Sequence, residues 1–348
     1  MHKLFAGLML LMLLMLGVAA MAPGAQAQEW RLNPTASRFY MQTEKAGGIF
    51  ENHQFTGLSG TVTADGDANV KIDLISVESG IDVRDVRMRF ILFETFKFPE
   101  ANISAKLDMN ALRGVMTGPR MEYPLKLNVN LHGIEKTIDT SVTVSRISPI
   151  SVSVATIKPI VVPADAFGFT AGIAKLSEAV GGIPIANAAT FTFDLIFETG
   201  DKIPEIKAAE TAAEQRKIQV ESAPISADAC ETRFSVISTT RAIYFRTGSA
   251  ELDPESAPML NSIVDIAGRC PGVRIEVSGH TDAVGQHPAN QRLSEQRAQA
   301  VADYMARQHV DRSRVETLGF GDTKPVAPND TESNRAKNRR IEFRVLQH

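Results

Sequence analysis

The stretch Leu125-Lys-Leu-Asn-Val-Asn-Leu131 alternates apolar and polar residues without exception. Successive side chains of a β-strand point to opposite faces, so this alternation indicates a strand with one buried face and one solvated face. The same pattern occurs in Val70-Lys-Ile-Asp-Leu74 and in Phe191-Thr-Phe-Asp-Leu195. We therefore expect a sheet whose two faces differ sharply in polarity.

Short runs of this kind dominate the chain from Trp30 to about Thr199, where glycine and Asp/Asn clusters separate them. Many short strands without long helices between them are typical of an antiparallel barrel or sandwich. Two mixed segments, residues 84–98 and 164–183, interrupt the pattern and favour short helices. We assign residues 28–199 to this first, all-β domain.

The apolar positions of these strands predict the interior of a barrel. They are Ile72, Leu74, Leu125, Leu127, Val129, Leu131, Phe191, Phe193 and Leu195. A small barrel either fills its interior with side chains or leaves room for one ligand. Alternation establishes a buried face, but a packed core and a ligand tunnel both satisfy it.

Residues 200–229 are charged, rich in alanine and free of aromatic residues, which predicts a linker between two folding units. Lys207 to Val220 consists mostly of residues that favour a helix. From Cys230 to the end, residues 230–348, the pattern changes to mixed α and β elements and predicts a second domain.

The second domain is expected to contain strands and helices in the order strand, helix, strand, helix, strand, strand. Asp253-Pro254 is typical of a helix start, and Asn290 is expected to cap a second helix that ends near Gln308. The four expected strands are Ala242–Phe245, Val273–Val277, Val315–Phe320 and Ile341–Leu346. This order predicts a small α/β sandwich with a mixed sheet.

Arg297 falls on the apolar stripe of the predicted helix after Asn290, four residues from both Leu293 and Val301. A cation on an inward face is costly unless an anion meets it. The loop that carries Asp282 leaves a strand near the start of this helix, so Asp282 is the natural neighbour. Such a pair could bind a ligand with an ammonium and a carboxylate group, or it could be a structural ion pair.

Four separated motifs occur in order in this second domain. They are Gly279-His-Thr-Asp-Ala-Val-Gly285, Asn290-Gln-Arg-Leu-Ser-Glu-Gln-Arg-Ala298, Leu318-Gly-Phe-Gly321 and Asn338-Arg-Arg-Ile-Glu-Phe343. Together they resemble the OmpA C-terminal family, which includes the Pal and MotB wall-binding domains. The resemblance implies binding of peptidoglycan through meso-diaminopimelate.

Matching the motifs residue by residue places the implied ligand contacts. They are Asp282 with its neighbour Thr281, Arg297, Asn290 and Arg339. One departure is Gly248, at a position where some members of the family have an asparagine that touches the ligand. A glycine offers only its backbone there.

The first domain carries softer motifs, again in order. They include Ser37-Arg-Phe-Tyr40, Phe55-Thr-Gly-Leu-Ser-Gly60, Ser79-Gly-Ile-Asp-Val-Arg-Asp85, Phe93-Glu-Thr-Phe-Lys-Phe-Pro99 and Leu131-His-Gly-Ile-Glu-Lys136. They resemble the YceI-like family, which implies a lipocalin-like antiparallel barrel that carries an isoprenoid or fatty chain. Arg84 and Asp85 match the Arg-Asp pair of that family, and we expect them, like His132, to be structural.

The N-terminus predicts export. Lys3 precedes an apolar run from Leu4 to Ala20, and Ala25-Gln26-Ala27 fits the small-x-small pattern of a signal-peptide cleavage site. We expect cleavage of residues 1–27 and a periplasmic protein that is associated with the wall or the outer membrane. The alternative is an uncleaved anchor in the inner membrane.

Cys230 and Cys270 are the two cysteines of the chain. In an oxidising compartment such a pair usually forms a disulfide, although two buried free thiols remain the alternative. No CxxC redox motif is present.

Other classes of function find little support. The net charge of −3 argues against a nucleic-acid binder. No Ser-His-Asp or Cys-His pattern indicates catalysis, no cofactor is implied, and His280 with His287 does not make a metal site. We expect a non-enzymatic binding protein. The rivals are a structural envelope linker with a filled barrel, an enzyme acting on isoprenoid or wall precursors, and a membrane-anchored wall-binding protein.

Overall fold

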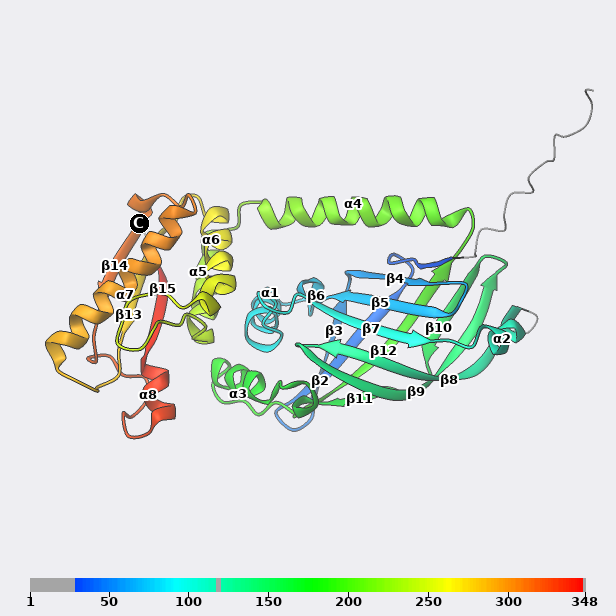
Figure 1. Ribbon diagram of the computed structural model, residues 1–348, viewed down its shortest axis with the longest axis horizontal. Coiled ribbons are helices and arrows are strands. Elements are labelled where there is room, and N and C mark those ends of the chain that lie inside the picture. The colour runs from blue at the N-terminus through cyan, green and yellow to red at the C-terminus, as the bar shows by residue number, and fades with distance from the viewer. Residues whose placement is uncertain (1–28, 117–119, 347–348) are drawn as a thin grey trace, which may run out of the picture.

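The computed structural model describes residues 29–116 and 120–346. Figure 1 shows a β-rich body, coloured blue to green, and a smaller body of helices and strands, coloured yellow to red. The predicted signal peptide, residues 1–27, lies outside the described residues. Within the described part of the chain, no helix has the length and apolar character needed to cross a membrane.

Eight strands of the described chain close into an antiparallel barrel, which confirms the predicted fold class of the first domain. Strand β1 pairs with both β4 and β12 and so completes the ring. In ring order the strands are β1 (Trp30–Leu32), β4 (Leu58–Val62), β5 (Asp67–Asp73), β7 (Glu100–Lys106), β8 (Arg120–Leu131), β9 (Ile134–Ser148), β10 (Ser151–Thr156) and β12 (Ala188–Glu198).

The sheet continues beyond the ring at one end of the barrel, because the first half of β12 pairs with β2 instead of β1. The added strands are β2 (Arg38–Lys45), β3 (Ile49–Phe55) and β6 (Val77–Glu78), while β11 (Ile160–Pro163) pairs with β12 on its other side. The barrel is therefore longer on the side of β2 and β3.

Strand β8 shows the physical basis of the barrel. Leu127, Val129 and Leu131 are buried, whereas Lys126 and Asn128 between them are exposed. The alternation in the sequence thus corresponds to an apolar interior and a polar outer surface.

Short helical segments interrupt the strands where the sequence predicted them. Helix α1 (Asp82–Arg87) continues into a π-helical turn, η2 (Met88–Leu92), and α3 (Thr170–Ala179) follows the 3-10 turn η4 (Ala164–Phe167). Three further segments lie outside the predicted ranges: the 3-10 turns η1 (Leu74–Ser76) and η3 (Arg113–Met116) and helix α2 (Met109–Leu112).

Helix α4 (Lys202–Ser222) connects the two bodies and runs alongside the barrel in Figure 1. It contains the helix predicted over residues 207–220 and begins five residues earlier. Ile206 is buried, and Glu210 forms an ion pair of 3.1 Å with Arg31 of β1. These contacts hold the helix against the barrel wall.

The second body is a three-stranded mixed sheet with helices. The strand order is β14-β13-β15, in which β13 is parallel to β14 and antiparallel to β15. The elements are α5 (Ala227–Thr240), η5 (Pro254–Ser256), α6 (Ala257–Arg269), β13 (Arg274–His280), α7 (His287–Arg307), η6 (Arg312–Arg314), β14 (Val315–Gly319), α8 (Glu332–Asn338) and β15 (Arg340–Leu346). The α/β class is as predicted.

Three details of the second body differ from the prediction. Residues 242–245 form no strand, only an isolated bridge between Phe245 and Leu252, because this segment lies outside the sheet. Helices α5 and α8 were not predicted.

The predicted disulfide is confirmed. It joins Cys230 of α5 to Cys270 at the end of α6.

The two bodies meet at a surface that we call the domain interface. Helix α5 packs against α1, η2 and α3, where Val86, Ile91, Leu176 and Val236 form one buried cluster. At its edge Arg233 lies 3.4 Å from Asp82. In Figure 1, α1 and α3 lie between the barrel strands and α5.

Candidate functional site

The candidate wall site forms at the end of β13, the central strand of the second sheet. After His280 the chain turns, and the backbone N–H of Thr281 donates to the carbonyl oxygen of Gly321 over 2.8 Å. This bond holds the loop against the segment that follows β14 (Val315–Gly319). As a result Thr281 and Asp282 are both buried, with 5% and 8% of their surface exposed.

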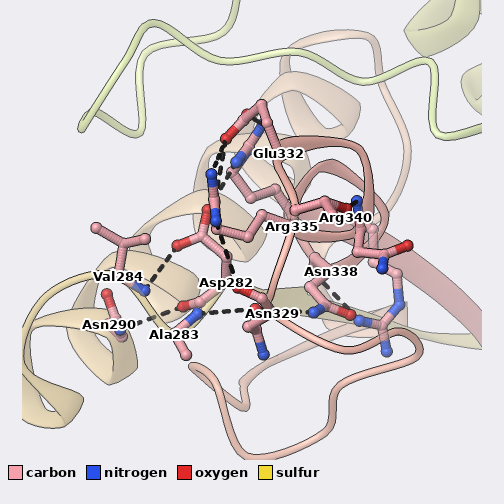
Figure 2. A network of polar contacts seen from close by, with 12 residues as sticks. Asp282, Ala283, Val284, Asn290, Asn329, Glu332, Arg335, Asn338 and Arg340 are labelled. Atoms are coloured by element: carbon pink, nitrogen blue, oxygen red, sulfur yellow. Dashed lines mark hydrogen bonds and ion pairs between the residues drawn. The ribbon is translucent and has the colours of Figure 1, made fainter.

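Asp282 is the centre of the polar network in Figure 2. Its Oδ1 accepts a hydrogen bond from the backbone N–H of Val284 over 3.0 Å. Its Oδ2 accepts from Nη1 of Arg339 over 2.7 Å, and Arg339 also binds Glu332 over 2.6 Å. Burial acts to lower the pKa of Arg339, but the bonds to Asp282 and Glu332 outweigh it and raise that pKa.

Arg297 lies on the inward face of α7 with 8% of its surface exposed. Its Nε donates to the carbonyl oxygen of Ser249 over 3.0 Å, and its guanidinium stands 5.0 Å from the centre of the Phe245 ring. Burial lowers the pKa of Arg297, Arg339 lowers it further, and Asp282 opposes both. Its two terminal nitrogens have no hydrogen-bond acceptor among the residues that the structure describes.

The direct ion pair expected between Asp282 and Arg297 is therefore not formed. Arg339 takes the Oδ2 atom of Asp282, and the carbonyl of Ser249 takes Nε of Arg297. Both expected residues are buried and close enough to influence each other electrostatically. The structural ion pair that the sequence left open exists, but its cation is Arg339.

The other predicted contact residues also lie around this loop. Asn290 does not cap α7, because the helix begins at His287 with Gln286 as its cap. Instead its side-chain amide, 6% exposed, donates to the carbonyl oxygen of Asp282 over 3.3 Å. The hydroxyl of Thr281 is buried without a hydrogen-bond partner in the described chain. Gly248 has a φ of +67°, and a side chain there would meet open space.

The two histidines of this region have separate surroundings. His280 is buried and stacks on Phe320, with ring centres 5.3 Å apart, while His287 binds Asp322 over 2.6 Å. No cluster of His, Cys, Asp and Glu side chains that could hold a metal occurs in residues 29–116 and 120–346.

The barrel interior is not filled. It holds two cavities of about 300 and 390 Å³. The predicted interior residues divide between them. Ile72, Leu74, Val129, Leu131 and Phe191 line the first, Leu125 and Leu195 line the second, and Leu127 and Phe193 line both.

Phe39 and Phe193 stand between the two cavities. Both line each cavity, and their rings are stacked at 6.0 Å with an angle of 9° between the planes. Phe39 also contacts Phe55 edge-on, with ring centres 6.0 Å apart. We call Phe39 and Phe193 the aromatic partition.

Arg84, Asp85 and His132 of the barrel have structural contacts. Arg84 pairs with Glu51 over 2.7 Å instead of with Asp85, whose Oδ1 accepts from the backbone N–H of Ser79 over 2.9 Å. The ring of His132 lies 3.2 Å from both the carbonyl oxygen of Phe167 and Oε2 of Glu94. Its bond to His132 is the main reason that the pKa of Glu94 is lowered.

Comparison with known families matches both halves of the chain. Residues 30–197 match the YceI-like domain, and residues 244–339 match the OmpA family. The probable lipoprotein YiaD of Escherichia coli K12 is 40% identical over 101 residues, which are 29% of this chain and 46% of YiaD. The peptidoglycan-binding protein ArfA of Mycobacterium bovis is 40% identical over 103 residues, 30% of this chain and 32% of ArfA.

This chain thus spans less than half the length of these two curated relatives. A solved polyisoprenoid binding domain from Saccharophagus degradans, implicated in plant cell wall breakdown, is 32% identical with a TM-score of 0.48. The match covers 49% of this chain and 98% of that domain.

Proposed function

We propose that this chain, which belongs to the YceI-like family over residues 30–197 and to the OmpA family over residues 244–339, is a non-catalytic binding protein of the cell envelope. Its C-terminal domain binds peptidoglycan, and its barrel carries a long apolar chain. Both candidate sites offer contacts for binding, and neither needs a cofactor.

The buried guanidinium of Arg297, with its two terminal nitrogens open, carries the proposal for the wall site. A guanidinium among apolar neighbours is costly unless an anion meets it, and a carboxylate can accept two parallel hydrogen bonds from it. Asp282, held by Val284 and Arg339, presents a carboxylate to the same region. The free amino-acid end of meso-diaminopimelate has both complementary charges.

Co-sedimentation with purified peptidoglycan tests this site. We expect Arg297→Ala to lose most binding, and Arg297→Lys to lose much of it because an ammonium cannot form the two parallel bonds. Arg344→Ala, on the exposed face of β15, is the matched control and should bind like the parent. Equal binding of all four proteins, or no competition by free meso-diaminopimelate, would remove the proposed site.

The two cavities in an apolar interior support the proposal of an isoprenoid or fatty-acid ligand. Apolar chains gain free energy roughly in proportion to the surface they remove from water. Native mass spectrometry of the protein purified from its host would show the added mass of such a chain. A protein without added mass that also takes up no alkyl chain in vitro would favour the structural linker.

We further propose that the protein is periplasmic after cleavage of its signal peptide. The disulfide between Cys230 and Cys270 supports an oxidising compartment. N-terminal sequencing of the exported protein should begin at Gln28, whereas an intact Met1 would favour a membrane anchor.

A further inference from the structure

The hairpin of β2 and β3 changes character along its inward face. Met41 lies opposite His53 and Thr43 opposite Glu51, so these four residues share one face of the hairpin. From Phe39 the inward positions of β2 run through Met41 to Thr43 and Lys45, and all four line the first cavity. The cavity is therefore apolar in its depth and polar toward the hairpin turn.

The polar lining of the first cavity comes from three elements. It consists of Thr43 and Lys45 of β2, Glu51 and His53 of β3, and Arg84 and Arg87 of α1. We call these six residues the head pocket. The cavity reaches the surface near them, since Ile81 and Ile183 also line it and are 45% and 38% exposed.

Cations outnumber anions in the head pocket. Oε1 of Glu51 forms ion pairs with both Lys45, at 2.5 Å, and Arg84, at 2.7 Å. Arg87 has no ion-pair partner among the described residues. Asp85, next to Arg84, does not line the cavity, and its carboxylate accepts a hydrogen bond from the backbone N–H of Ser79. The head pocket keeps a net positive charge even when Asp85 is counted.

His53 adds an unused polar atom to this pocket. Its side chain is 2% exposed, and Nε2 lies 2.9 Å from the hydroxyl of Thr43. Its Nδ1 is buried without a hydrogen-bond partner in the described chain. Burial lowers the pKa of His53, and Arg84 lowers it further. His53 therefore adds a polar side chain to the lining of the cavity, and the buried Nδ1 without a partner is costly in free energy.

We propose that the head pocket binds the anionic head group of the carried chain, a carboxylate or a phosphate, while the cavity takes its tail. This inference rests on the proposed lipid-carrying function and specifies the class of ligand. Lys45, Arg84 and Arg87 supply charge-assisted hydrogen bonds to the head group. A neutral alcohol or an apolar chain would leave these cations without a new partner.

The test compares three ligands with the same tail, which are dodecanoic acid, dodecyl phosphate and dodecanol. Their affinities for the delipidated full-length protein are measured by displacement of a fluorescent alkyl probe. We expect at least one of the two anions to bind about tenfold or more tightly than dodecanol, as charge-assisted bonds allow. The acid and phosphate arms identify which anion is preferred.

Substitutions then assign this preference to the head pocket. Lys45→Gln and Arg84→Gln should reduce binding of the anions and leave dodecanol unchanged. The matched control is Lys71→Gln, since Lys71 pairs with Glu100 on the outer face of the barrel and should affect neither. Circular dichroism and the retained binding of dodecanol show that each variant is folded.

The possible outcomes distinguish failure of the head-pocket inference from failure of the lipid-carrying function on which it rests. Equal affinity for the acid, the phosphate and the alcohol overturns the head-pocket inference while the lipid-carrying function stands. The head-pocket inference is also overturned if the preference for anions is retained in both Lys45→Gln and Arg84→Gln, or if the control Lys71→Gln removes it as well. If none of the three ligands binds, the lipid-carrying function fails together with the inference.

Discussion

Arg339 donates a hydrogen bond to Oδ2 of Asp282 over 2.7 Å, although 57 residues separate the two in the chain. The bond joins the loop after β13 to the end of α8. It fixes the orientation of the Asp282 carboxylate, whose other oxygen is held by the backbone of Val284. Arg297 is thereby left with open terminal nitrogens beside an oriented acid.

Asp282→Asn should weaken peptidoglycan binding by roughly 2–5 kcal/mol, because it removes the charge that a ligand ammonium would meet and the ion pair with Arg339 that orients this carboxylate. Co-sedimentation over a range of peptidoglycan concentrations measures the change. The control is Asp303→Asn on the exposed side of α7, which removes a carboxylate that accepts a hydrogen bond from Gln299 and lies away from the candidate site. Unchanged binding by Asp282→Asn would show that its ion pair is purely structural.

Glu342 links the stability of the C-terminal domain to pH. His280, 3.6 Å away, and Arg340, which donates over 2.6 Å, lower the pKa of Glu342 to about 2. We attribute more of the effect to Arg340 because its contact is shorter. The folded-state pKa is depressed, so the stabilisation is present above the unfolded pKa near 4.5 and is lost as pH falls toward 2.

Glu342→Gln should therefore cost about 1–2 kcal/mol of unfolding free energy at neutral pH, allowing for the screening of a carboxylate that is 36% exposed. Urea denaturation at several pH values measures the difference between variant and parent. The difference should shrink as pH falls from about 4.5 toward 2. A difference that stays constant over this range would exclude the ion pair as its source.

Reduction of the disulfide between Cys230 and Cys270 should lower the stability of the C-terminal domain by about 3–4 kcal/mol. The bond closes a loop with a sequence separation of 40 residues and restricts the unfolded chain accordingly. Denaturation of the double variant Cys230→Ala, Cys270→Ala should give the same loss without reductant. A parent protein whose unfolding is indifferent to reductant would contradict this.

Phe193→Ala should join the two barrel cavities at the aromatic partition, at a cost of about 3–5 kcal/mol in stability. The joined cavity should accept longer alkyl chains than the parent, as native mass spectrometry of a chain-length series would show. Phe197→Ala removes the same volume but borders only the second cavity, so its longest bound chain should not change. Identical length limits in both variants would mean that the partition does not divide the ligand space.

Sequence periodicity predicted the barrel well because each strand carries its own signal. The alternation in β8 and β12 requires only neighbouring residues to be compared, and both strands were found. Helix α5 was missed although Cys230, Phe234 and Ile237 are buried at helical spacing. Its intervening Ser, Thr and Val residues have only middling helix propensity, which obscured the pattern.

The sequence predicted which residues lie around the loop after β13, but not which of them form hydrogen bonds with one another. Each of Asp282, Asn290 and Arg297 sits in a motif, whereas the choice of Arg339 as the partner of Asp282 depends on where α8 ends in space. The sequence could not predict that the carbonyl oxygen of Ser249 accepts from Arg297 either, because every residue has such a backbone atom. Cavities in the barrel also depend on how side chains meet across strands far apart in the chain.

The domain interface is one of two connections between the C-terminal domain and the barrel; the other is the chain itself through α4. If the C-terminal domain is held by the wall as proposed, tension between it and the barrel reaches α1 and α3 through their contacts with α5, and it reaches β12 through the covalent connection of α4. The non-covalent route, with Val236 at its centre, can separate while the covalent route holds. Since Arg84 and Arg87 of α1 also line the first cavity, force on the proposed anchor would act at the polar end of the proposed lipid site.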